Sequence, residues 1–126
     1  DYQLIINIFD LEKKMAYVIK DLQKIVPVPT THQIGLKQVL LANDETASAV
    51  TQIAKTQLLS GEVVEDHVHL TMDEHYLCFS GEGTLWVDGS EIPFTKDTYV
   101  LVKAGSKHHL EAISDISFLT IGIAID

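Results

Sequence analysis

The sequence contains no arginine. All nine basic residues are lysine, and against eighteen acidic residues they leave a formal net charge of −9. Arginine is the usual side chain for a two-point grip on carboxylates and phosphates, so its absence disfavours a ligand with a strongly anionic handle. An acidic surface also repels polyphosphates. We therefore expect no nucleic-acid partner.

Cysteine and long apolar runs are scarce as well. The single cysteine, Cys78, excludes a disulfide within the chain and fits a reducing cytosol, so we expect a cytoplasmic protein. No run of eighteen apolar residues is present, so no segment is predicted to span a membrane. The 126 residues, 46% of them hydrophobic, are enough for one compact domain with a core.

Short β-branched segments separated by turn residues dominate the chain after residue 30, and they predict an all-β domain over residues 31–126. Asp88-Gly89, between two apolar runs, is typical of a two-residue hairpin turn. Eight short strands without intervening helices predict a sandwich or small barrel. The expected strands are 34–41, 50–59, 67–70, 74–79, 83–88, 98–102, 108–113 and 116–125.

Residues 1–30 read as an N-terminal extension with two open interpretations. Apolar residues from Leu4 to Ile25 recur at helical steps, whereas the β-branched and aromatic residues of YQLIINIF favour an edge strand. Met15 follows Glu12-Lys13-Lys14, whose codons can resemble a ribosome-binding site. We hypothesise that Met15 is the biological start. A native peptide beginning before Met15, found by mass spectrometry, would refute this.

A group of histidines and a glutamate lies between Gly61 and Gly81. Side chains at i and i+2 of a strand share a face, so His67 and His69 project together with Cα atoms roughly 6–7 Å apart. Glu74 follows a short turn and can return beside them. Two histidines and a carboxylate form a recognised metal triad.

These residues and a second motif resemble the cupin superfamily, specifically a small single-domain cupin. Gly61, His67-Val68-His69, Glu74 and Gly81 fit the first cupin motif, G(X)5HXH(X)3-4E(X)6G, throughout. The second motif, G(X)5PXG(X)2H(X)3N, is matched in part. The matching positions are Gly105 and His108, while Asp97, Lys103 and Ala112 replace the first glycine, the proline and the asparagine.

The resemblance spans about residues 34–125 and implies a small β-barrel, or double-stranded jelly roll, after a short N-terminal extension. It also implies that one metal ion is bound by His67, His69, Glu74 and His108. Such a ligand set suits Fe(II), Mn(II), Ni(II), Cu(II) or Zn(II), and the donor atoms do not choose among them.

Two functions of different classes follow. The first is a metal-dependent enzyme acting on a small neutral or weakly acidic molecule, as a dioxygenase, a sugar isomerase or epimerase, or a lyase, with dioxygen chemistry slightly preferred. The alternative is a non-catalytic metal-containing protein that binds a small ligand such as a sugar. One fold hosts many chemistries, so the fold does not decide between them.

For several other side chains, the sequence permits both a functional role and a simpler structural one. Strand alternation puts Tyr76 and Cys78 on the side of Glu74. Tyr76 is then a proton donor to the substrate or an aromatic filling the barrel, and Cys78 an inert buried thiol. Lys103 meets an anionic substrate or is a solvated turn residue. Trp86 is expected in the core or a pocket wall. The remaining histidines are expected to be surface or hydrogen-bonded residues, namely His32, His75 and His109.

Small β-barrels usually need cover for exposed faces and edges. We therefore expect a homodimer in which N-terminal strands pack across, or exchange between, the subunits.

Overall fold

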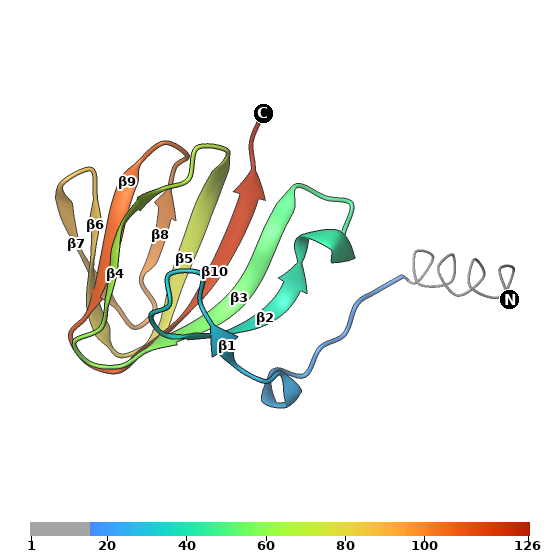
Figure 1. The fold of residues 1–126 in the computed structure, drawn as a ribbon, viewed down its shortest axis with the longest axis horizontal. Helices are drawn as coiled ribbons and strands as arrows, with labels where there is room; N and C mark the ends of the chain where they lie inside the picture. The colour runs from blue at the N-terminus through green and yellow to red at the C-terminus, as the bar shows by residue number, and fades with distance from the viewer. Residues whose placement is uncertain (1–15) are drawn as a thin grey trace, which may run out of the picture.

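Two antiparallel sheets make up the computed structural model, which describes residues 16–126 (Figure 1). The six-stranded sheet has the order β1 (Val28–Pro29), β2 (Leu36–Ala42), β3 (Val50–Leu58), β10 (Ile116–Ala124), β5 (Met72–Ser80) and β8 (Tyr99–Val102). The four-stranded sheet has the order β4 (Val63–Val68), β9 (Lys107–Ala112), β6 (Glu82–Val87) and β7 (Ser90–Thr95). The helices described are two short 3-10 turns, η1 (Leu22–Lys24) and η2 (Asn43–Glu45). The predicted all-β class is confirmed, while closure into a barrel stays a prediction.

The core lies between the two sheets and follows the alternation of each strand. On β5, Tyr76 and Cys78 are buried, whereas Phe79 is exposed. Leu110 on β9 and Leu85 on β6 meet them from the opposite sheet. Burying an apolar side chain of this size stabilises the fold by about 1.5–3 kcal/mol relative to leaving it exposed. The predicted inward side of β5 is therefore correct.

Two details of the strand prediction are wrong. The strand expected at 67–70 is β4, which begins at Val63 and pairs there with Glu111 of β9. Strand β7, which was not predicted, contains Pro93. Proline cannot donate a backbone hydrogen bond and is tolerated in edge strands, and β7 is the edge of its sheet.

The described part of the predicted extension runs along the edge of the larger sheet. The side-chain amide of Gln38 on β2 donates to the carbonyls of Leu22 and Ile25, each at 2.9 Å, and holds η1 against the sheet. The two residues of β1 then pair with β2. Residues 1–15 lie outside the described residues, so the choice between helix and strand there, the hypothesis on Met15 and the boundary at residue 30 stay predictions. Within residues 16–126, no helix has the length and apolar character needed to cross a membrane.

Turns with positive φ connect the strands. Asp88 (φ 48°) and Gly89 (φ 83°) join β6 to β7 as the predicted two-residue hairpin turn. Gly81 (φ 87°) joins β5 to β6, where a Cβ would lie 2.1 Å from the carbonyl oxygen of Asp115. A Cβ on Gly89 would meet nothing within 4 Å. Both positions thus require a residue that tolerates positive φ, and at Gly81 the nearby backbone also leaves no room for a side chain.

We predict that Gly81→Ala lowers the free energy of unfolding by about 2–4 kcal/mol, because strain at positive φ adds to a backbone clash. The matched control Gly89→Ala should cost only about 1–2 kcal/mol, the strain alone. Urea denaturation of both variants measures the difference. Equal losses would show that the close approach at Gly81 carries no energetic weight.

Candidate metal centre

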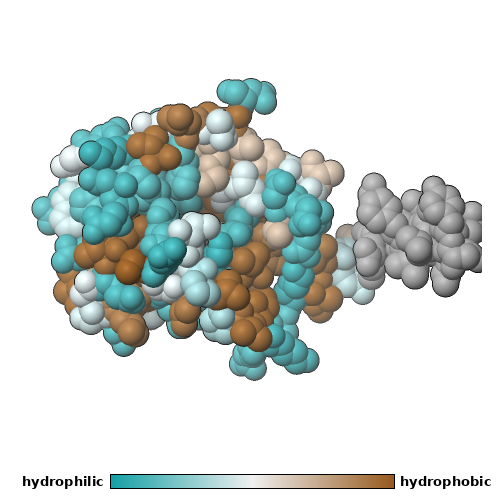
Figure 2. Space-filling model, viewed as in Figure 1, coloured by the Kyte–Doolittle hydropathy of each residue, from teal (hydrophilic) through white to brown (hydrophobic). Residues whose placement is uncertain are grey.

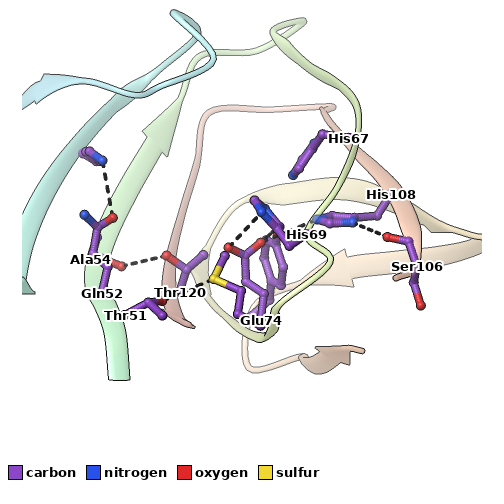
Figure 3. Close-up of polar contacts among 12 residues, drawn as sticks. Thr51, Gln52, Ala54, His67, His69, Glu74, Ser106, His108 and Thr120 are labelled. Atoms are coloured by element: carbon purple, nitrogen blue, oxygen red, sulfur yellow. Dashed lines mark hydrogen bonds and ion pairs between the residues drawn. The ribbon is translucent and has the colours of Figure 1, made fainter. Parts of the chain in front are cut away.

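Three strands bring the four predicted ligand residues together. His67 on β4 pairs directly with His108 on β9, and their ring centroids are 4.0 Å apart. His69 follows β4 on the same face, and Glu74 enters from β5. One ligand atom from each of the four side chains lies within 4.8 Å of all the others. Figure 3 shows His67, His69, Glu74 and His108 directed toward one region.

Backbone carbonyls orient two of the imidazoles. Nδ1 of His67 lies 2.8 Å from the carbonyl oxygen of Glu65, and Nδ1 of His108 lies 3.0 Å from that of Ser106. A carbonyl only accepts, so each Nδ1 carries the hydrogen and donates it. In the neutral ring the lone pair is therefore on Nε2. This is the arrangement by which metal-binding histidines are usually held.

His108 presents a buried nitrogen without a hydrogen-bond partner. The residue is 1% exposed, and its Nε2 has no hydrogen-bond partner among the described residues. The nearest carboxylate oxygen, Oε1 of Glu74, is 3.6 Å away, beyond hydrogen-bonding distance. Buried polar atoms are nearly always satisfied. A cation bound at Nε2 would satisfy this one, so the donor set fits a metal ion.

The ionisation of the cluster agrees with this geometry. Burial, together with the neighbouring His108, His32 and His69, lowers the pKa of His67 to about 4, although the Glu65 carbonyl opposes the shift. His67 is thus neutral at pH 7, the form that binds metals.

The pKa values of Glu74 and His108 are shifted in opposite directions. Burial acts to raise the pKa of Glu74, but His108 and Tyr76 outweigh it and the pKa is lowered. Burial acts to lower the pKa of His108, but Glu74 and the Ser106 carbonyl outweigh it and the pKa is raised. Together these shifts favour a proton on His108 beside an ionised Glu74. A metal cation would compete with that proton for the imidazole.

Tyr76 is hydrogen-bonded to the cluster. Its hydroxyl donates to Oε1 of Glu74, and its ring packs against Phe118 and Phe94 in the core. Burial, and then the charge of Glu74, raise the pKa of Tyr76 well above its ordinary value, so the hydroxyl keeps its proton. The contact observed for Tyr76 is with Glu74. Its predicted role as a proton donor to substrate stays a prediction.

The turn before β9 is tied to the first motif. The N–H of Gly105 donates to the carbonyl of His69 at 2.8 Å, and the N–H of Ala104 donates to the Asp73 carboxylate at 2.9 Å. These bonds couple the position of His108 to that of His69. At the second-motif positions that depart from the cupin pattern, Asp97 adopts the left-handed conformation (φ 69°) expected of glycine, and Ala112 is buried.

A cavity of about 270 Å³ adjoins the cluster. It is small, since pockets for drug-sized ligands occupy about 300–1,000 Å³. One wall carries His67, His69 and Glu74, and the opposite wall is rich in hydroxyl and amide groups. Figure 3 shows Gln52, Thr51 and Thr120 across from the histidines. The hydroxyl and amide residues that line the cavity are Thr30, Thr31, Thr51, Gln52, Thr56 and Thr120.

Two functional candidates were missed by the sequence reasoning. His32, expected to be a surface or hydrogen-bonded residue, is exposed, but its ring centroid lies 4.3 Å from that of His67, and it lines the cavity. Burial, and then His69, lower the pKa of His32. Lys37 on β2 also lines the cavity. A signal for Lys37 existed, because strand alternation puts it opposite its exposed neighbour Leu36, but nothing in the sequence placed β2 beside the histidines.

The other predicted side chains lie elsewhere. His75 contacts the Tyr99 hydroxyl at 2.6 Å, and His109 contacts Asp66 at 2.7 Å, so the predicted surface or hydrogen-bonded state of these two histidines is correct. Trp86 stacks on His109 and lines a separate surface pocket. Lys103 is an exposed turn residue and does not line the cavity. Cys78 is a buried free thiol whose pKa is raised by burial.

Comparison with known proteins agrees with the fold and the motif. The family model of the cupin domain matches residues 55–122, which include all four clustered residues. The tetracenomycin polyketide synthase protein TcmJ of Streptomyces glaucescens is 25% identical over 83 residues, 66% of this chain and 56% of TcmJ. The chain thus spans little more than half the length of that curated relative.

Solved structures share the architecture. A protein described as a predicted oxalate decarboxylase, from Thermotoga maritima, has a TM-score of 0.79 at 22% identity and covers 86% of this chain and 100% of its own. Ectoine synthase from P. lautus has a TM-score of 0.75 at 20% identity, and the match covers 86% of this chain and 78% of the ectoine synthase chain. At these identities the likeness establishes the fold alone.

We predict that Tyr76→Phe weakens zinc binding by about 10- to 100-fold, because Glu74 loses the donor that orients its carboxylate. The ring remains, so the fold should be retained. Tyr99→Phe, which removes a hydroxyl bonded to His75 outside the cluster, is the matched control. Titration against a chelating zinc indicator measures both affinities. Equal affinity of Tyr76→Phe and the wild type would rule out this positioning role.

Proposed function

Because the chain belongs to the cupin domain family, we propose that His67, His69, Glu74 and His108 hold one divalent transition metal ion in a small metal-dependent enzyme. The observation that carries the proposal is the convergence of the four ligand atoms within 4.8 Å at the wall of a cavity. The buried Nε2 of His108, which finds no hydrogen-bond partner in residues 16–126, also supports it.

Three imidazole nitrogens and one carboxylate oxygen suit iron, manganese, nickel, copper or zinc. When bound, such an ion supplies Lewis-acid polarisation of a substrate oxygen and, for the redox-active metals, reaction with dioxygen. Within this proposal, a dioxygenase is slightly preferred to a sugar isomerase or epimerase, or a lyase.

The residues of the chain would position the substrate and limit its hydration. Threonine hydroxyls and the Gln52 amide can donate to, or accept from, the oxygens of a small ligand. Val64, Leu110 and Met72 line other parts of the cavity and reduce its exposure to water. Tyr76 holds the Glu74 carboxylate toward the histidines. A small oxygenated molecule fits both the lining and the volume.

The second candidate is a non-catalytic protein that binds a sugar. A stacking surface for sugars would favour it, but the aromatic lining residues Tyr76 and Phe118 are buried in the core. Trp86 belongs to a different pocket. The curated relative TcmJ is named as a polyketide synthase protein, and a role in biosynthesis agrees with an enzyme. These observations favour the enzyme.

We predict that protein purified without an affinity metal column contains about one transition metal ion per chain. His67→Ala and His108→Ala should lose most of this metal, since each substitution removes one of the proposed ligands. His75→Ala, which removes a histidine outside the cluster, should retain it. Elemental analysis measures the metal content. Unchanged content in His67→Ala would contradict the ligand assignment.

Oxygen uptake separates the reaction classes. Iron or nickel with consumption of dioxygen on addition of substrate would support the dioxygenase. Zinc or manganese without it would support isomerase, lyase or binding function.

We also propose that the protein is a homodimer. Large apolar side chains on the outer face of the six-stranded sheet are exposed, with Tyr99 at 55%. Figure 2 shows brown hydrophobic patches among hydrophilic residues on the side of the molecule that faces the viewer. Large exposed apolar residues on one face of a sheet are typical of an interaction site. On that face the exposed residues are Leu36, Phe79, Tyr99 and Leu101. The segment before β1 adds Tyr17, Val18, Ile19 and Val26, which are available to a partner subunit.

We predict a molecular mass of about twice 14.0 kDa in solution. Leu101→Glu should shift the protein toward the monomer, because it places a charge on the proposed interface. Ile113→Glu, at an exposed apolar position that follows β9, is the control. Light scattering at micromolar concentration measures the mass, and a monomeric wild type would refute the dimer.

A further inference from the structure

We propose that the cavity binds a small carboxylate, whose anionic group is held by Lys37 on the wall opposite the histidines. This inference rests on the proposed function, because it names the class of ligand for the same cavity. It also revises the expectation that the absence of arginine disfavours an anionic handle.

Lys37 faces the cavity because of its place on β2. It pairs with Thr56 of β3, which is buried and lines the cavity, while the preceding Leu36 is exposed on the outer face. Before β2, the hydroxyl of Thr30 donates to the Ile34 carbonyl at 2.6 Å, which closes the loop that carries His32. The loop and the strand together form one side of the cavity.

The ammonium group of Lys37 lacks an acidic partner within the described part of the chain. No carboxylate of residues 16–126 lies within 4.0 Å of Nζ, although eighteen acidic residues are present in the sequence. Its contact is the side-chain oxygen of Gln52, at 3.4 Å. Lys20 and Lys107 pair with Glu45 and Asp66. Within the described residues, Lys37 shares the lack of an acidic partner with Lys55, but Lys37 lines the cavity and Lys55 does not. A half-buried ammonium without a counter-ion is left to be completed by an anion.

His32 brings the loop before Lys37 into contact with the histidine cluster. Its ring centroid lies 4.3 Å from that of His67, and His32 lines the same cavity as Lys37. A ligand in the cavity would therefore lie between an ammonium group and the cluster. Apart from Lys37, His32, Tyr76 and the cluster, the lining residues that the structure describes carry no ionisable side chain.

The charge and size of the site select a carboxylate. One ammonium group balances one negative charge, and a charge-assisted hydrogen bond from Lys37 would hold it. A phosphate would bring a greater charge into a cavity whose described lining already contains the Glu74 carboxylate and has Lys37 but no second lysine. The volume of about 270 Å³ limits the ligand to a small molecule, with hydroxyl or keto oxygens for the threonines and the cluster.

The test compares small carboxylates with their neutral amides. The probes are lactate and lactamide, pyruvate and pyruvamide, and succinate and succinamide, each titrated by calorimetry into metal-free and zinc-loaded protein. We expect at least one carboxylate to bind about 10- to 100-fold more tightly than its amide, as for the loss of a charge-assisted hydrogen bond. No preference for any carboxylate would overturn the proposal.

Lys37→Met removes the charge and should abolish that preference, and Lys37→Gln serves as the second variant if the first does not fold. The matched control is Lys55→Met. Lys55 on the neighbouring strand β3 adjoins the inward Ala54 and Thr56, so it faces the other side of the sheet, and its replacement changes the net charge equally. Unchanged carboxylate preference in the Lys37 variants, or an equal loss in Lys55→Met, would overturn the proposal.

Metal content in the same samples separates the two proposals. Lys37 is outside the ligand cluster, so its variants should keep the metal content of the wild type. Wild-type protein without metal would count against the metal-dependent enzyme, whereas the preference of metal-free protein for carboxylates would still report on Lys37.

Discussion

Antiparallel pairing of β4 with β9 is the constraint on which the site depends. It sets His67 opposite His108, so that two motifs distant in the sequence contribute rings 4.0 Å apart. A slip of one residue would turn either ring to the other face of the sheet. The hydrogen bond from Gly105 to the His69 carbonyl fixes the same alignment through the backbone. The register of one strand pair thus determines whether a metal centre can form.

The surroundings of the cluster divide into a rigid side and a receptive side. Carbonyls behind His67 and His108, and the Tyr76 hydroxyl behind Glu74, orient the donors from the core. Preorganisation of this kind is what a metal site requires of its outer contacts. Across the cavity, Lys37 and the threonines leave hydrogen-bonding capacity for a ligand. The proposed metal and the proposed carboxylate would be held by different side chains around one small cavity.

Much of the fold was predictable, because alternating apolar residues and flanking turn residues indicate most of the strands. The hairpin at Asp88-Gly89 and the inward side of β5 are correct. The errors occur where a strand is stabilised by its position in the sheet rather than by its own pattern. β7 contains Pro93, and this proline is tolerated because β7 is the edge strand of its sheet. β4 extends back to Val63 because β9 pairs with it there.

The sequence by itself determined the all-β class and the four clustered residues, because spacing within a strand and the cupin motifs are local properties of the chain. Only the tertiary structure decided what surrounds the cluster. Strand alternation indicates the face of β2 on which Lys37 lies, but no local pattern places Lys37 or His32 beside the histidines. The packing of β2 and its preceding loop against the cavity brings them to the site. Contacts between distant strands depend on sheet order and register, which no short stretch of sequence encodes.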